Sequence, residues 1–549
     1  MHAFRSLPRK IKPNPIPIVH RLYRRLTTAD AFAPAATEFL EQTEIENEDL
    51  PAEDENASSF QRGSSEAAFG RNRIGCIVLP PDLELGIKKI INGSSQTPDA
   101  TLEKNKPLIR EDALRMYESF RSTSKLPDEP EEPVTPSKRL AKVQRPQDSA
   151  GPPSSHVINY GLRESVAYIA GAMPSTFAAI CNVLLEVRRR VPGFVPGSVL
   201  DFGAGPGTAI WASREVYHES LRDYSGVDIS EQMLRIAEEL LTFFVSRVFS
   251  CSDQTAENKI SNVEFKRYLS YSPNKPKTDL VISAFTLNDI PTDSLRTTIL
   301  ESLWKQTGDV LVLIERGTPL GYHTVMWARD WVLRQENRKA VDGMEVQGVH
   351  VVAPCPHDGP CPILGVSKRE WCHFSQKVRR PKFLMKTKHA KVNFEDARYS
   401  YVVLQRGARP AAGLYALETP DPTAMAHSAY HWPRLILPPL KRSGHVVMDV
   451  CTSLGHLERM VVPKSQGKVP YYDARKVMWG DLFPHAPKNP GVRRKRGTES
   501  GAEQAAVVTE KRRRSLERKR KRRQDNGNGN GNGNGNGNGN GNGNGDDNM

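Results

Sequence analysis

Between residues 157 and 333, two patterns of apolar positions alternate along the chain. Short apolar runs, which predict buried strands, occupy 198–202, 226–228, 279–283 and 309–315. Stretches with apolar residues at helical spacing occupy 163–173, 175–190, 230–244 and 294–304. Strands that alternate with helices in this way predict an α/β fold with a doubly wound, parallel sheet.

The pattern changes on both sides of this region. Strand-like runs separated by turn residues follow at 398–405, 434–437, 445–451 and 457–462, and they predict a small β domain. Upstream, residues 30–60 are acidic and residues 123–155 are rich in Pro, Ser and charge, as linkers are. Between these two stretches, an alternating run that becomes helical is expected over 73–92, and a helix over 109–122.

The formal net charge of +14 is concentrated near the C-terminus. Residues 491–523 hold fourteen basic and four acidic residues. Such blocks are typical of disordered arms that contact phosphate backbones, and a solvated or nuclear-targeting tail is the alternative. The Asn-Gly run at 526–545 is low-complexity chain.

The first 29 residues hold seven Lys or Arg and no acidic residue. This composition is typical of a mitochondrial presequence and predicts import into the matrix. No run of about 18 consecutive apolar residues occurs, so no membrane span is expected. The spread of the seven cysteines along the chain suits a reducing compartment.

A glycine-rich segment, Asp201-Phe-Gly203-Ala-Gly205-Pro-Gly207, follows one expected strand and opens a helix. Glycines allow a tight turn and let backbone amides approach a ligand closely. Asp228 ends the next expected strand, where its carboxylate can accept both hydroxyls of a ribose. The leading acid suits the cationic end of S-adenosylmethionine, and the segment resembles motif I of class I methyltransferases. A glycine turn that serves only packing is the alternative.

The strand end that should meet a methyl acceptor reads Ser283-Ala-Phe-Thr-Leu-Asn288-Asp289-Ile-Pro291. It lacks the Asn/Asp-Pro-Pro-Tyr/Phe signature that aligns an exocyclic amine, and it holds no cysteine for a covalent route to 5-methylcytosine. Asn288 and Asp289 are the polar candidates for catalysis, and capping of the following helix is their alternative role.

Four cysteines form a candidate metal-binding set: Cys355, Cys361, Cys372 and Cys451. Thiolates bind zinc or iron–sulfur clusters. The short Cys-x2–4-Cys pairs usual for zinc are missing, and irregular spacing with Cys-Pro steps favours a [4Fe–4S] cluster. Both groups remain candidates on spacing alone. His357 and His373 are alternative ligands, or else ordinary loop histidines near a basic surface.

Basic residues surround these thiols, and Trp371, Phe374 and Phe383 are interleaved with them. The basic residues are Lys368, Arg369, Lys377, Arg379, Arg380, Lys382, Lys386 and Lys388. Aromatic side chains among cations can stack on unpaired bases, so the segment predicts an RNA-binding surface. A solvated basic face is the alternative.

Together these segments resemble the mitochondrial small-subunit family called Rsm-twenty-two in fungi and methyltransferase-like protein seventeen in animals. The resemblance covers roughly residues 157–480 and is carried by Ala167-Tyr-Ile-Ala, Met173-Pro-Ser-Thr-Phe-Ala-Ala179, Val199 to Thr208, Trp211-Ala212, Ser283-Ala-Phe285, Glu315 to Gly321, Cys355 to Pro362, Trp371-Cys-His-Phe374 and Asp449-Val-Cys451. It implies a class I methyltransferase-like fold with doubtful catalysis, which agrees with the missing acceptor signature.

The same resemblance implies a factor that binds small-subunit ribosomal RNA beside ribosomal proteins during assembly and supports mitochondrial translation. It further implies a [4Fe–4S] cluster on the four cysteines. An active S-adenosylmethionine-dependent methyltransferase of that RNA is the alternative function. A third hypothesis, an electron-carrying or iron-sensing protein, requires a redox-active cluster.

The expected organisation has six parts. They are a presequence (1–29), a largely disordered linker with short helices (30–155), a methyltransferase-like domain (156–335), a cysteine region (336–394), a small β domain that supplies Cys451 (395–487) and a basic, Asn-Gly-rich tail (488–549).

Overall fold

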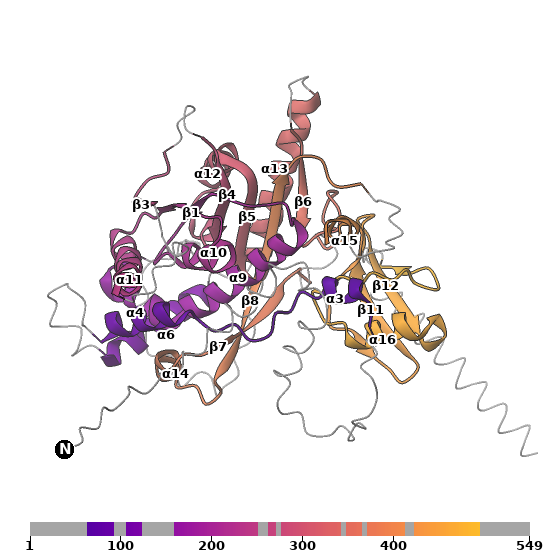
Figure 1. The fold of residues 1–549 in the computed structure, drawn as a ribbon, viewed down its shortest axis with the longest axis horizontal. Coiled ribbons are helices and arrows are strands. Elements are labelled where there is room, and N and C mark those ends of the chain that lie inside the picture. The colour runs from indigo at the N-terminus through magenta and orange to yellow at the C-terminus, as the bar shows by residue number, and fades with distance from the viewer. Residues whose placement is uncertain are drawn as a thin grey trace, which may run out of the picture. The chain divides into compact units, whose positions relative to one another are not determined.

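The computed structural model describes residues 63–92, 106–122, 159–250, 262–270, 276–341, 347–364, 370–411 and 422–494. All of these ranges belong to one compact unit of the chain, residues 1–494, which Figure 1 shows. The expected presequence, the acidic and Pro/Ser-rich linkers and the tail beyond residue 494 lie outside the described residues.

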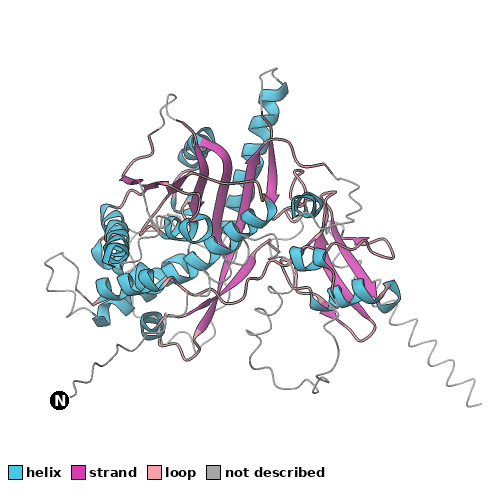
Figure 2. Cartoon of the chain, in the orientation of Figure 1, coloured by secondary structure: helices cyan, strands magenta, loops and turns pink. Residues whose placement is uncertain are grey.

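A mixed eight-stranded sheet has the order β3-β2-β1-β4-β5-β8-β6, with β7 paired to β8. Its strands are β1 (Ser198–Phe202), β2 (Asp223–Val227), β3 (Asn262–Lys266), β4 (Thr278–Ala284), β5 (Thr307–Arg316), β6 (Val349–Ala353), β7 (Phe374–Arg379) and β8 (Phe394–Arg406). Strands β1 to β5 pair in parallel, and β8 runs antiparallel between β5 and β6. Figure 2 shows these strands with helices around them. The predicted α/β fold is confirmed, but the expectation of a wholly parallel sheet is wrong, because β8 pairs antiparallel with β5, β6 and β7.

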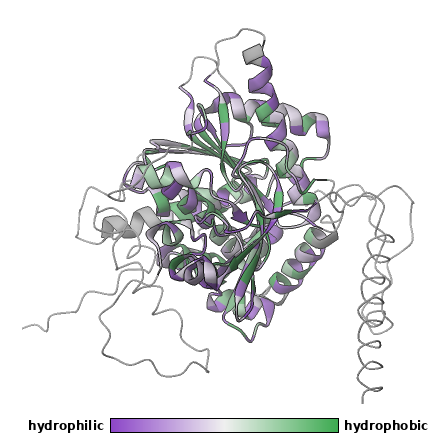
Figure 3. Ribbon diagram, turned by 90° about the vertical axis from the view of Figure 1, so that its right-hand side faces the viewer, coloured by the Kyte–Doolittle hydropathy of each residue, from purple (hydrophilic) through white to green (hydrophobic). Residues whose placement is uncertain are grey.

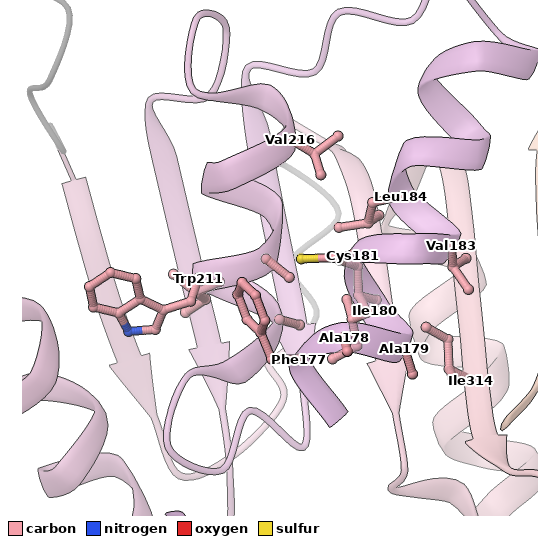
Figure 4. Packing of buried hydrophobic residues seen from close by; sticks show 14 of the residues in the cluster. Phe177, Ala178, Ala179, Ile180, Cys181, Val183, Leu184, Trp211, Val216 and Ile314 are labelled. Atoms are coloured by element: carbon pink, nitrogen blue, oxygen red, sulfur yellow. The ribbon is translucent and has the colours of Figure 1, made fainter. Parts of the chain in front are cut away.

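Helices cover both faces of the sheet because successive strand residues point to opposite sides. One face carries α8 (Leu162–Gly171), α9 (Met173–Arg190), α10 (Thr208–Tyr217) and α11 (Glu231–Ser250), and the other carries α12 (Asp293–Gln306) and α13 (Pro319–Val341). In β4, Leu280 and Ile282 join the first core cluster, and Val281 between them joins the second. Figure 4 shows the first cluster, where Phe177 of α9 lies near Trp211 of α10.

The strand expected at 398–405 is β8, and it lies in the large sheet instead of opening a separate β domain. Tyr401 and Val403 belong to the core on one face, and Val402 and Leu404 belong to the core on the other. A strand buried on both faces has a continuous apolar run, and such a run does not identify its sheet.

The short helices expected upstream are present and pack on the core. They are α3 (Ser65–Gly70), α4 (Pro81–Ile91) and α6 (Lys106–Ser122). Leu83, Ile87 and Ile90 of α4 recur at helical spacing and are buried. Ile77, which precedes α4, forms a β-bridge with Val378 of β7. Residues 63–92 and 106–122 are therefore part of the folded body, whereas the sequence placed them in a linker.

A second sheet has the order β10-β11-β12-β13, with β9 paired to β11. Its strands are β9 (Arg434–Leu435), β10 (Leu440–Lys441), β11 (His445–Cys451), β12 (Leu457–Pro463) and β13 (Val492–Arg493). Helix α15 (Pro422–Ala429) precedes β9 and α16 (Lys468–Lys476) lies between β12 and β13, whereas α14 (Lys382–Lys388) connects β7 to β8 of the large sheet. Val446, Met448 and Val450 of β11 alternate into its core. Figure 3 shows hydrophobic residues gathered where strands and helices meet. The strands predicted at 445–451 and 457–462 are confirmed.

Among the described helices, none alone has the length and apolar composition to cross a bilayer. Helices α8 and α9, which meet at a bend of 59°, pass that test only as a pair.

Candidate functional site

The glycine segment forms the turn from β1 into α10. Gly203, Gly205 and Gly207 have φ angles of 75°, 52° and 77°, a region that glycine adopts without steric cost. A Cβ on Gly203 would lie 2.0 Å from the hydroxyl oxygen of Thr286, which follows β4. The predicted tight turn is confirmed, and its first glycine allows β1 and β4 to end close together.

Asp228 follows β2 and contacts this turn through its carboxylate. Its Oδ2 accepts the N–H of Gly205 at 2.8 Å, and its Oδ1 accepts the N–H of Ser230 at 2.8 Å. Burial raises the pKa of Asp228, and the two backbone donors oppose that effect. Each carboxylate oxygen has a further lone pair, so the residue retains acceptor capacity for hydroxyl groups.

Asp201 lies under the turn with 1% of its surface exposed. Burial, followed by the nearby charge of Asp228, raises the pKa of the Asp201 carboxyl to about 7. Its Oδ2 has no hydrogen-bond partner among the described residues, nor do the hydroxyls of Thr208 and Ser283. Buried polar atoms normally have partners, so this group of atoms fits a polar ligand.

Asn288 and Asp289 lie in a 3-10 turn after β4, η3 (Leu287–Asp289). The Asn288 Nδ2 donates to Glu315 Oε2 at 3.0 Å, and its Oδ1 accepts from the Thr324 hydroxyl at 2.6 Å. Glu315 is fully buried, and burial raises its pKa to about 7. The amide of Asn288 therefore bonds to β5 and α13 through one of its two N–H groups and one of its two lone pairs.

Asp289 pairs with Arg316, the last residue of β5, at 3.8 Å. The Arg316 guanidinium lies 3.8 Å from the ring centroid of Phe120 in α6. Burial raises the pKa of Asp289, and the charge of Arg316 opposes this. The upstream helix α6 thus contacts the strand end where a methyl acceptor would enter.

The four candidate cysteines line one cavity together with Met326, Pro354, Ile363, Phe374, Ser400, Tyr401, Arg434 and Ile436. Cys355 and Cys361 follow β6, Cys372 precedes β7, and Cys451 ends β11. Cys355, Cys361 and Cys451 are each 7% exposed. Residues from both sheets therefore meet at this cavity.

Burial raises the pKa of three of the thiols in this cavity, those of Cys355, Cys372 and Cys451. Burial raises the pKa of the Cys355 thiol to about 11. Burial and the neighbouring cysteines raise the pKa values of Cys372 and Cys451 well above the usual range. A bound metal centre requires thiolates, so its binding would release protons here.

Polar side chains surround the sulfur atoms. The Tyr322 hydroxyl lies 3.2 Å from Cys361 Sγ, and the His357 Nε2 lies 3.4 Å from Cys451 Sγ. Arg329 is fully buried and donates to the carbonyl oxygens of His357 and Gly359 at 3.0 and 2.7 Å. His357 is thus beside the cysteines.

His373 instead packs between two tryptophan side chains, with ring centroids 5.3 Å from Trp371 and 4.6 Å from Trp479. It does not line the cavity.

The cavity itself is small, about 20 Å³, which is room for about one water molecule. Within the described residues, no group of three or more His, Cys, Asp or Glu side chains has the geometry for one metal ion. The four thiols thus share one cavity that, with the side chains as they lie, has room for about one water molecule, and an inorganic cluster would require these side chains to rotate outward.

The expected RNA-stacking residues are mostly inaccessible. Phe374 and Phe383 are 2% and 8% exposed, so the expectation that they stack on bases is wrong. Phe374 occupies an inward position of β7, whose side chains alternate between core and surface, and Phe383 faces the core from α14. Trp371 is half-buried and donates its indole N–H to Gly317 at 3.1 Å.

The cations expected beside them divide into exposed and paired groups. Lys377, Arg379, Lys382 and Lys386 are exposed. Arg380 and Lys388 pair with Glu395 at 2.9 and 2.6 Å. Lys368 and Arg369 lie outside the described residues.

The sequence model of a protein family described as "Mitochondrial small ribosomal subunit Rsm22" matches residues 162–484. This match begins at the first residue of α8. It covers the strands of the large sheet, the cysteine cavity and most of the second sheet. The chain belongs to the Rsm22 family. The predicted resemblance is confirmed.

Several members of the Rsm22 family are similar to this chain. The human "Ribosome assembly protein METTL17, mitochondrial" is 34% identical over 328 residues, which cover 60% of this chain and 64% of the human protein. The Saccharomyces cerevisiae "Ribosome assembly protein RSM22, mitochondrial" is 26% identical over 423 residues, or 59% of this chain and 67% of the yeast protein. A Schizosaccharomyces pombe Rsm22-cox11 tandem protein is 34% identical, and the match spans 43% of it. The chain thus spans less than two thirds of the human relative.

Solved methyltransferases show weaker similarity to this Rsm22 family member. A S-adenosylmethionine-dependent methyltransferase from Aquifex aeolicus is 20% identical with a TM-score of 0.23, covering 35% of this chain and 90% of that one. A precorrin-6y C5,15-methyltransferase from Geobacter metallireducens is 16% identical with a TM-score of 0.22, covering 42% and 87%. The assignment of the fold rests on the strand order.

Proposed function

We propose that this protein is an assembly factor of the mitochondrial small ribosomal subunit, acts in the matrix and binds ribosomal RNA. The observation that carries the proposal is that Cys355, Cys361, Cys372 and Cys451, in a chain of the Rsm22 family, line a single buried cavity. Related proteins from human and budding yeast are named mitochondrial ribosome assembly proteins. The seven basic residues among the first 29 support import.

We further infer that these four cysteines hold a [4Fe–4S] cluster. They approach the cavity from the segment after β6, the segment before β7 and the end of β11. A bound cluster would supply a covalent link between the two sheets. The Tyr322 hydroxyl and the His357 ring would offer hydrogen bonds to ligating sulfurs. Buried Arg329 and Arg434 would offset the negative charge of the thiolates, since both interact electrostatically with these cysteines.

Exposed cations of β7 and α14 support RNA binding. Lys377 and Arg379 occupy outward positions of β7, and Lys382 and Lys386 occupy the exposed side of α14. Release of counterions from RNA makes such contacts favourable without sequence preference. A rigid cluster beneath β7 would hold these side chains in a fixed arrangement.

An active methyltransferase of ribosomal RNA is the second candidate. The glycine turn, the buried Asp201 with an unpartnered oxygen and the hydroxyl-accepting Asp228 favour S-adenosylmethionine as a ligand. The bonds of Asn288 to Glu315 and Thr324 favour assembly without catalysis. Binding of the cofactor and catalysis are therefore separate questions for this chain.

The test is to express a tagged full-length chain in cells that lack their own copy. Crosslinking, purification and sequencing of the bound RNA should recover small-subunit ribosomal RNA, and the protein should sediment with small-subunit precursors. A Lys377→Glu/Lys382→Glu variant should recover less of this RNA, whereas Lys305→Glu on α12, also an exposed lysine, should match wild type. Sedimentation only as free protein, with no enrichment of ribosomal RNA, would refute the proposal.

A further inference from the structure

A second cavity, of 380 Å³, lies along α13 and shares no residue with the cysteine cavity. Its lining consists of His323, Trp327, Asp330, Trp331, Arg334, Gln335, Arg338 and Leu364. All but Leu364 belong to α13, and each lies three or four residues from at least one other, a spacing that places them on one side of the helix. Figure 1 shows α13 beside β6.

Two tryptophans form the apolar part of this cavity. Trp327 and Trp331 are one helical turn apart and only half-buried, although both pack partly against the second core cluster. Tryptophan presents a large flat surface that usually becomes covered, so this pair suits a planar ligand.

Cations form the rim. Arg334 and Arg338 are exposed one turn further along α13. The one acidic lining residue, Asp330, already pairs with buried Arg329 at 2.6 Å, while Arg334 is 3.8 Å from it. The rim therefore carries net positive charge, which is complementary to phosphate.

We propose that this cavity binds an unpaired nucleotide of RNA, with its base stacked on Trp327 or Trp331 and its phosphate at Arg334 and Arg338. The volume is in the usual range for small-molecule sites, about 300–1,000 Å³. Aromatic faces with adjacent arginines are the usual means of holding single-stranded RNA. The assignment rests on the proposed RNA-binding function and gives it a specific site.

The site is also connected to the cysteine loop. Leu364 lies three residues after Cys361 and forms part of the wall. Arg329 of α13 holds the carbonyl oxygens of His357 and Gly359 in that loop. A change in the position of the cysteine loop would therefore change the shape of the nucleotide site.

The test uses full-length protein and a fluorescently labelled, single-stranded uridine oligomer. An Arg334→Glu/Arg338→Glu variant changes only exposed side chains. It should bind the oligomer more weakly. The slope of log affinity against log salt concentration should also be smaller by roughly 1.4, about 0.7 for each lost phosphate contact. Arg235→Glu, which removes an exposed arginine from a similar i,i+4 pair on α11, should bind like wild type.

A second variant, Trp327→Leu/Trp331→Leu, tests stacking. Loss of one stacked base should weaken binding roughly five- to hundred-fold. Ultraviolet crosslinking of wild type should label the peptide that contains these tryptophans, and circular dichroism checks that both variants fold.

The outcomes separate this site from the general function. Unchanged affinity in the arginine variant, with crosslinks confined to β7 and α14, would overturn the nucleotide site. The cavity would then be assigned to a segment of a partner protein, and the proposed function would stand. A wild-type protein that binds neither this oligomer nor ribosomal RNA would overturn both.

Discussion

The side-chain amide of Asn288 donates to the buried carboxylate of Glu315 at 3.0 Å, and the main-chain N–H of Asn288 donates to the same carboxylate at 3.2 Å. The Thr324 hydroxyl completes the arrangement by donating to the Asn288 carbonyl oxygen at 2.6 Å. In a catalytic role, this amide would have to be free to face the acceptor. Here it joins the ends of β4 and β5 to α13.

We therefore expect Asn288→Ala to reduce stability more than any enzymatic activity. The substitution removes a donor from a fully buried carboxylate, and an unsatisfied buried group costs about 1–3 kcal/mol. Denaturant unfolding measures this cost, and mass spectrometry of small-subunit ribosomal RNA measures methylation. Asn262→Ala is the matched control because its amide also donates to a carboxylate, that of Asp223 at 2.7 Å, at an exposed position. A methyl group lost in a variant of normal stability would assign Asn288 to catalysis.

The contribution of Asp201 to the free energy of unfolding should change with pH in the opposite direction from that of most carboxylates. Its pKa in the folded protein is raised to about 7 from 3.8, so between these values the folded state binds a proton that the unfolded state has lost. Stability contributed by this residue therefore falls as pH rises from about 4 to about 7 and is constant above that. Asp201→Asn should remove the effect and stabilise the free protein above pH 7 by on the order of a few kcal/mol.

The same substitution tests the cofactor pocket. An amide has no negative charge to attract the cationic amine of S-adenosylmethionine, so Asp201→Asn should weaken its binding in calorimetry while it stabilises the free protein. Equal affinity in wild type and variant would remove Asp201 from the cofactor site. Unfolding curves at several pH values separate the two effects.

Glu186 and Arg434 form a buried ion pair between α9 and β9, and each is 2% exposed. Burial raises the pKa of Glu186, but the charges of Arg434, Arg189 and Arg190 outweigh it and hold the pKa below the usual value of 4.5. The stability this pair contributes is present above pH 4.5 and is lost as pH falls through the lower, folded pKa. Glu186→Gln should cost about 3–5 kcal/mol at neutral pH, because it leaves the Arg434 cation buried without its partner.

Asp449→Asn provides the control for that measurement. Asp449 pairs with Arg459 at 2.8 Å on the surface of the second sheet, where the arginine is 51% exposed. Exposed pairs contribute about 0–1 kcal/mol. Equal costs for the two variants would show that burial adds nothing to the Glu186–Arg434 pair.

The sequence predicted local structure well wherever one periodicity dominated. β1 was predicted with its observed bounds, and the run expected to become helical over 73–92 contains α4. It could not assign β8 to the large sheet, because a strand buried on both faces carries no alternation that identifies its partners. The sequence also could not show which side chains of a strand point into the core, since the burial of Phe374 is decided by the pairing of β7 with β8.

The residues of the candidate sites were also only partly predictable from the sequence. The four cysteines could be grouped because their type is rare, and they do line one cavity. The side chains that contact them could not be found, because Tyr322 and Arg329 look like ordinary residues of a long helix. Only the packing of α13 against the cysteine loop gives them their positions. The tryptophan cavity was missed for the same reason.

The cysteine cavity gives the last prediction. Protein purified without oxygen should be coloured, with iron and acid-labile sulfide in equal amounts, and Cys451→Ser should lose most of both. Because Cys451 ends β11 while the other ligands flank β6 and β7, this variant should also unfold at a lower temperature. Chelation of iron from wild type should lower the unfolding temperature similarly.

Cys181→Ser is the matched control for this experiment. Cys181 is also buried, with 2% exposed, but it lies in the first core cluster among apolar side chains and does not line the cysteine cavity. The chemical change is identical in the two variants, so only a role in binding the inorganic group predicts loss of iron in one and not in the other. A colourless wild-type protein with zinc in place of iron would contradict the cluster, and the shared cavity would then hold a different centre.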